Sequence, residues 1–166
     1  GGRRTEEAVR GALEWLRRHQ SPDGSWKARD FTLQCRTPCR NLDPARYGDG
    51  RGFPEHDVGV TGLAVLAFAG YGHTHRDGEH HEYIECVSRA ARWLLSTQVR
   101  STDPATDGRF GPAEDEQWIY DHAIATMALG ELYVMTHDVL LLQRPVEDAV
   151  RLCLRAQNEG FGWRYG

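Results

Sequence analysis

The chain has 166 residues, of which 40% are hydrophobic, and its formal net charge is −4 at pH 7. This length is enough for one domain with its own hydrophobic core. The negative charge argues against a nucleic-acid partner, which requires a basic face, and the sequence contains no run of about 18 apolar residues that could cross a membrane.

The hydrophobic pattern predicts five helices of two alternating kinds. Helices near 5–20, 82–98 and 145–157 are amphipathic, with apolar residues at helical spacing and arginines on the other faces. Helices near 57–71 and 117–136 are apolar and small on most faces, which is typical of a helix buried between others. We therefore expect an outer layer of amphipathic helices around an inner pair, with a sixth helix to follow the last residue.

The same unit recurs three times along the chain. Alignment of 9–20 with 87–98 and 146–157 superposes three glutamines, and a glycine-rich loop with an aromatic residue follows each glutamine. The inner segments 61–68 and 122–129 also align. A fixed repeat of this size indicates stacked supersecondary units. The sequence thus predicts one all-α domain over 1–166, with helical-hairpin repeats near 5–72, 82–138 and 145–166.

The most specific motif lies between Arg10 and Trp26. Arg10-Gly11, Trp15-Leu16, Gln20 and Gly24-Ser25-Trp26 resemble the QW motif of the squalene–hopene and oxidosqualene cyclases. The inner segment 120–126 is similar to the prenyltransferase and squalene oxidase repeat proteins. The resemblance covers nearly the whole chain apart from the loop at 27–56.

This resemblance implies an α/α-toroid of the terpenoid cyclase and protein prenyltransferase superfamily, of which the chain forms a part. In that family the glutamine of the motif is thought to brace the start of a neighbouring helix while it stacks on the tryptophan. Such a role is physically sensible, because helix starts leave backbone N–H groups without partners. The structural motif residues are then Trp15, Gln20, Gly24, Trp26, Trp93, Gln98, Gln157 and Trp163.

Three catalytic candidates stand at or near the starts of the inner helices. Asp57 and Asp121 could act as acid and base at the mouth of a toroid, and His122 could shuttle a proton. The alternatives are helix capping for both carboxylates and a hydrogen-bonded structural role for the histidine. The Asp-x-Asp-Asp acid motif of the cyclases does not occur, and the zinc set of the prenyltransferases does not map onto this sequence.

Aromatic side chains on or near the inner helices are candidates for binding an apolar substrate. Aromatic faces stabilise carbocations, although aromatics at helical spacing are also typical of a plain core. The candidates are Trp118, Tyr120, Phe68 and Tyr133.

Two groups of residues are candidates for a metal-binding site. Cys35 and Cys39 have the spacing of a zinc-ligand pair, but only His56 offers itself as a third ligand, so a local disulfide or two free thiols is favoured. The histidine-rich turn at 73–81 fits a solvated loop. We expect neither a cofactor nor a resident metal ion.

Two functions are compatible with these observations. The first is a cyclase-like or prenyltransferase-like repeat domain that handles an apolar isoprenoid-type molecule, with enzymatic activity left open. The second is a non-catalytic helical scaffold that binds a protein or glycan through the acidic loops at 21–56 and 99–116. A partial toroid leaves inner apolar surface uncovered, so a second copy or a further chain is expected to close it.

Overall fold

The computed structural model describes residues 2–35, 52–112, 118–160 and 162–163, and this part of the chain contains five α-helices and no strand. The expected all-α class is confirmed. The helices are α1 (Gly2–Arg18), α3 (Asp57–Gly70), α4 (His81–Ser96), α5 (Trp118–Thr136) and α6 (Arg144–Arg155). Two 3-10 turns, Phe31–Gln34 and Pro54–His56, and a π-helical turn, Val139–Gln143, connect them.

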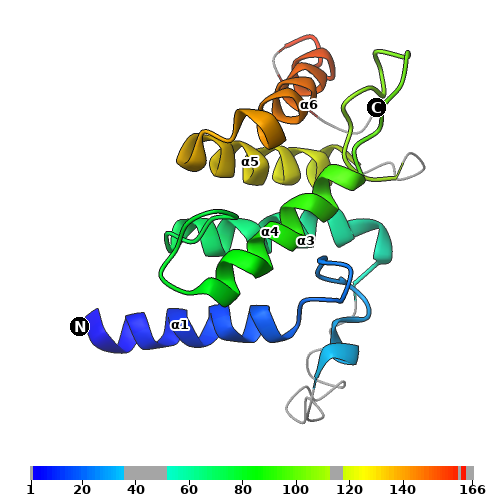
Figure 1. The fold of residues 1–166 in the computed structure, drawn as a ribbon. Coiled ribbons are helices and arrows are strands. Elements are labelled where there is room, and N and C mark those ends of the chain that lie inside the picture. The colour runs from blue at the N-terminus through cyan, green and yellow to red at the C-terminus, as the bar shows by residue number, and fades with distance from the viewer. Residues whose placement is uncertain (1, 36–51, 113–117, 161, 164–166) are drawn as a thin grey trace.

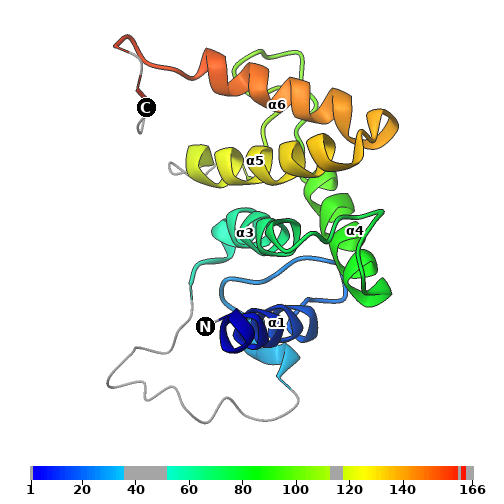
Figure 2. The same cartoon turned by 90° about the vertical axis from the view of Figure 1, so that its left-hand side faces the viewer.

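Helices α3 and α5 lie side by side and form the centre of the structure (Figure 1). Helix α4 packs obliquely on α3, α1 contacts α3 on the side away from α5, and α6 packs on α5. Turned by 90°, the molecule shows α1, α3, α5 and α6 stacked in that order (Figure 2). The two apolar segments of the sequence are therefore the two central helices, as their composition predicts.

Glycine allows α3 and α5 to approach closely. A Cβ atom at Gly59 would lie 2.0 Å from Oδ1 of Asp121, and one at Gly62 would lie 2.9 Å from Cγ2 of Ile124. Both glycines have an ordinary helical backbone conformation. Glycine is therefore needed at these positions because there is no space for a side chain, and not because of its conformational freedom. The small residues in the sequence of α3 thus serve the packing of the central pair.

The core lies between the central pair and α4. Phe68 of α3, Leu94 of α4 and Leu129 and Leu132 of α5 are fully buried. Burial of each such side chain stabilises the fold by about 1.5–3 kcal/mol. Helix α1 has a single buried residue, Leu13, and is correspondingly peripheral.

The first glutamine of the motif joins α1 to α4. Gln20 Nε2 donates to the carbonyl of Gly24 within its own loop, at 2.9 Å, and to the carbonyl of Cys86 in α4, at 2.8 Å. Its Oε1 accepts from the guanidinium of Arg89. Gly24 has a φ of 97° and a Cβ there would meet the Arg89 carbonyl oxygen at 2.6 Å. We call this set of contacts the Gln20 junction.

The amide nitrogen of the second glutamine makes equivalent contacts between the loop after α4 and α6. Gln98 Nε2 donates to the carbonyl of Gly108, at 3.1 Å, and to that of Pro145 in α6, at 2.9 Å. Asp148 stands three residues after Pro145, as Arg89 stands three after Cys86, and it accepts from Arg100 in the loop at 2.6 Å. The Oε1 of Gln98 is buried without a hydrogen-bond partner among the described residues. We call this set the Gln98 junction.

Two tryptophans of the motif also have equivalent bonds. Trp26 Nε1 donates to the carbonyl of Leu16, and Trp163 Nε1 donates to that of Cys153, both at 2.8 Å. Trp26 is buried, whereas Trp15, which the motif pairs with it, is 45% exposed. Gln157, the third glutamine, is partly buried, and Trp93 lies under the ammonium group of Lys27.

We expect Gly59→Ala to lower the free energy of unfolding by about 1–3 kcal/mol, because the new methyl group would push α3 and α5 apart. Gly70→Ala is the matched control, since nothing lies within 4 Å of its Cβ position. Urea unfolding followed by circular dichroism measures both variants. Equal stabilities for the two would show that the helices are not in close contact at Gly59.

The two tryptophans of the first repeat are expected to differ. Trp26→Ala should cost about 3–5 kcal/mol because a buried ring is removed, and Trp15→Ala should cost less than half as much. Denaturant midpoints of the two variants test this order. A shift below about 1 kcal/mol for Trp26→Ala would contradict its place in the core.

Candidate functional site

Asp57 anchors the loop that precedes the central pair. It is the first residue of α3, where a carboxylate is favoured by the helix dipole. Its Oδ1 accepts from the backbone N–H of Ala28 at 2.7 Å, and its Oδ2 lies 3.3 Å from Nζ of Lys27. These contacts favour the structural alternative for Asp57, because both oxygens already hold the loop at 27–28.

Asp121 pairs with a histidine that the sequence did not connect with it. It is a nearly buried residue in the first turn of α5, and its Oδ2 accepts from Nδ1 of His56 at 2.8 Å. His56 directly precedes Asp57, so Asp57 and Asp121 lie at the same end of the central pair. A histidine–carboxylate pair can orient an imidazole for proton transfer, and a third of the His56 side chain remains exposed.

The His56–Asp121 pair was missed because 65 positions separate its members. His56 entered the sequence argument only as a possible third metal ligand for Cys35 and Cys39. Its position immediately before the charged start of an inner helix was the available signal. Only the packing of α3 against α5 brings its ring to Asp121.

His122 is fully buried and both of its ring nitrogens are bound by backbone groups. Nδ1 accepts from the N–H of Phe110 at 3.1 Å, so the proton is on Nε2, which donates to the carbonyl of Ala149 at 3.1 Å. Burial lowers the pKa of His122 to about 4. A neutral imidazole with both nitrogens occupied fits the structural alternative and has neither a lone pair nor an N–H to offer a substrate.

Two of the aromatic candidates belong to the core. Phe68 is fully buried, with ring centroids of Trp26 and Tyr83 at 6.2 and 5.3 Å. Tyr133 is partly buried and packs against the same core.

The other two aromatic candidates lie on α5. Trp118 begins this helix, with the ring of His122 at 5.7 Å and the guanidinium carbon of Arg109 at 5.5 Å from its own ring. Tyr120 is half exposed. Phe68 and Tyr133 thus pack in or against the core, whereas Trp118 and Tyr120 lie in the first turn of α5.

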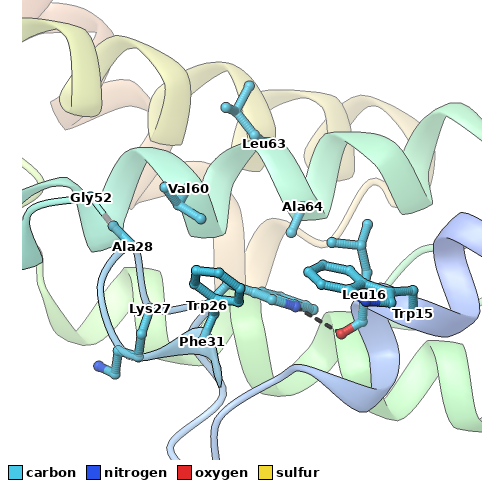
Figure 3. A pocket seen from close by; sticks show the side chains of 10 residues that line it. All are labelled: Trp15, Leu16, Trp26, Lys27, Ala28, Phe31, Gly52, Val60, Leu63 and Ala64. Carbon is cyan, nitrogen blue, oxygen red and sulfur yellow. Dashed lines mark hydrogen bonds between the residues drawn. The ribbon is translucent and has the colours of Figure 1, made fainter. Parts of the chain in front are cut away.

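An apolar pocket of about 460 Å³ lies between α1, α3 and the loop after α1 (Figure 3). Val60, Leu63 and Ala64 form its α3 wall. The remaining lining residues are Trp15, Leu16, Trp26, Lys27, Ala28, Phe31 and Gly52. The sequence motif predicts a stacking role alone for Trp15 and Trp26, whereas the structure shows that both also line this pocket.

The histidine-rich turn is not uniformly solvated, which corrects the expectation from sequence. His73 and His75 are buried, and Nε2 of His75 lies 3.1 Å from Oδ2 of Asp138, whereas His80 and His81 are exposed. In the described part of the chain, no group of three or more histidine, cysteine, aspartate or glutamate side chains could hold a metal ion.

Several residues of the two acidic loops lie outside the described residues. Cys39, Asp43, Asp49, Glu114, Asp115 and Glu116 belong to those parts. Of the acidic residues that are described, Asp23 accepts from Ser25, and Asp107 accepts from the N–H of Ser101 at 3.1 Å. These carboxylates are used within their own loops.

A comparison with protein-family models, curated proteins and solved structures finds no match to this chain. Among the described helices, none combines the length and apolar character that crossing a bilayer requires.

The low pKa of His122 predicts acid-sensitive stability. Above pH 6.5 neither the folded nor the unfolded chain protonates this side chain to a large extent; between about pH 6.5 and 4 only the unfolded chain does. Stability is therefore expected to be fully present above this window and to fall by about 3 kcal/mol across it.

Urea unfolding at several pH values measures this effect against His122→Gln. The variant should be less stable at neutral pH, but it should lack this part of the pH dependence. Parallel pH profiles for the two proteins would contradict the role given to His122.

Proposed function

We propose that the chain is a segment of an α/α-toroid of the squalene cyclase-like and prenyltransferase-like kind, with α3 and α5 on its inner wall. The equivalent contacts of Gln20 and Gln98 support this architecture, because each joins one outer helix to the next in the same way. The equivalent bonds of Trp26 and Trp163 support a third repeat that begins with α6. The three repeats near 5–72, 82–138 and 145–166 are part of the proposal.

The proposed function is to bind an apolar, isoprenoid-type molecule on the free face of the central pair. The observation that carries it is a row of apolar side chains on α5 at which half or more of the residue is exposed: Tyr120, Met127 and Val134. Residues seven apart lie two turns apart on one helix face, so the three α5 residues form a stripe. Exposed apolar surface of this kind marks an interaction site.

Binding, rather than cyclisation, is proposed. Protonation of an alkene requires an acidic side chain poised beside the substrate. The cyclase acid motif does not occur in this sequence, and the described carboxylates at the end of the central pair are held by Lys27, Ala28 and His56. Closure of the toroid by a second copy or a further chain is part of the same proposal, and light scattering distinguishes a monomer from a dimer.

A fluorescent dansyl-labelled farnesol is the probe for this site. We expect the purified chain to bind it, Met127→Glu to weaken the binding by about tenfold, and Met127→Leu to bind as the parent does, because a carboxylate disfavours contact with an apolar ligand. Fluorescence titration gives the dissociation constants. Absence of binding to the parent chain, or equal binding by the glutamate variant, would overturn the proposal.

A further inference from the structure

We propose that Cys35 and His19 form a nucleophilic thiol site that accepts an acyl group from an apolar acyl thioester. The site lies at the end of α1, next to Trp15, which stacks on His19 and also lines the pocket of Figure 3, and it is not on the free face of α5. This inference therefore depends neither on the toroid nor on the isoprenoid ligand proposed above.

The hydrogen bonds of His19 direct its free lone pair at the sulfur. Nδ1 lies 2.7 Å from the carbonyl oxygen of Trp15, which can only accept, so the ring proton is on Nδ1. Nε2 is then an acceptor, and it lies 3.2 Å from Sγ of Cys35. A nucleophile, a base within hydrogen-bond reach and a third group that orients the base are the three parts of an activated nucleophile.

Stacking holds the imidazole in place. The rings of His19 and Trp15 are 3.9 Å apart between centroids and 17° from parallel. His19 is buried, whereas Cys35 is partly exposed, so the base is shielded while the sulfur can be reached. An indole face also stabilises the imidazolium that forms when the base takes a proton.

The repeat architecture does not require a histidine at this position. His19 directly precedes Gln20, and the residues that precede Gln98 and Gln157 are Thr97 and Ala156. The loops nevertheless close with equivalent backbone bonds of 2.7–2.8 Å, from the residue after each glutamine to the carbonyl before each aromatic residue. The donor–acceptor pairs are Ser21–Ser25, Val99–Arg109 and Asn158–Gly162. His19 is thus an addition to the loop rather than part of its closure.

The other described cysteines serve as internal controls. Burial raises the pKa of the Cys86 thiol to about 12 and also raises that of Cys153. Both are therefore poor nucleophiles at neutral pH, because the thiolate is the reactive form.

The neighbouring pocket indicates the class of acyl donor. Trp15 stacks on His19 and also lines the pocket, and the 3-10 turn Phe31–Gln34, whose first residue lines the pocket, directly precedes Cys35. The pocket and the thiol site therefore share Trp15, and an acyl chain held in the pocket has its carbonyl end next to this shared residue. A long-chain acyl thioester meets both requirements, with an electrophilic carbonyl carbon and an apolar tail.

The reaction is a thioester exchange. The Cys35 proton passes to Nε2 of His19, and the thiolate attacks the carbonyl carbon of the donor. A new carbon–sulfur bond to Cys35 forms as the bond to the leaving thiol breaks. The leaving thiolate takes the proton back from His19, so the exchange needs no oxidant, reductant or further reactant.

The first experiment measures alkylation of each cysteine by iodoacetamide at neutral pH, by mass spectrometry of peptides. We expect Cys35 to react faster in the folded chain than in concentrated urea, whereas Cys86 and Cys153 should react faster in urea. His19→Phe retains an aromatic ring beside Trp15 but lacks the base, and it should slow folded-state alkylation of Cys35 by about tenfold. Folded-state reactivity no greater than that in urea, an unchanged rate in the variant, or no alkylation of Cys35 before reduction would each overturn the site.

The second experiment tests the donor. Palmitoyl-coenzyme A should acylate Cys35 about tenfold faster than acetyl-coenzyme A at equal concentration, as followed by intact mass. Leu63→Glu introduces a carboxylate at the α3 wall of the pocket, and it should remove this preference without changing the iodoacetamide rate. Equal rates with both donors would show that the thiol is activated but that the pocket does not hold an acyl chain, which overturns the assignment of the donor.

Discussion

Helices α3 and α5 can lie in close contact only because Gly59 and Gly62 present no side chain to α5. Most of the described structure follows from that contact. It encloses the core with α4, and it sets the first turn of α5 beside the start of α3, where His56 reaches Asp121. A bulkier residue at either glycine would move the core and the His56–Asp121 hydrogen bond together, so packing and candidate chemistry share one constraint.

The glutamines add a different kind of connection. Each amide nitrogen bonds one carbonyl in its own loop and one in the following outer helix, and these groups are removed from water. A buried carbonyl that has no hydrogen-bond donor destabilises the fold by about 1–3 kcal/mol. The glutamine amide removes this cost for one carbonyl of the loop and one carbonyl of the helix. This explains why a polar residue is retained inside an otherwise apolar contact.

The helices themselves could be predicted from sequence, because apolar spacing and small-residue content are local properties of the chain. The equivalence of 61–68 and 122–129 also had a physical basis: Thr61 and His122 each accept the backbone N–H of the aromatic residue that stands two positions after a glycine in the preceding loop, Trp26 and Phe110 respectively. The site was harder to predict. The two backbone groups that occupy the ring of His122 belong to Phe110 and Ala149, which are distant in sequence, so the sequence could not show that this histidine is fully hydrogen-bonded. The contact between His19 and Cys35 depends on the path of a loop, which the sequence pattern does not determine.

The two junctions are similar in shape but opposite in charge. At the first, the following helix supplies a cation, Arg89, to an oxygen of the loop; at the second it supplies an anion, Asp148, to a cation of the loop, Arg100. A helix docked at the wrong junction would place Asp148 against the oxygen of Gln20 and Arg89 against Arg100, and both encounters repel. The two junctions are thereby distinguished by charge although their shapes are similar, which favours docking of α4 and α6 each at its own glutamine.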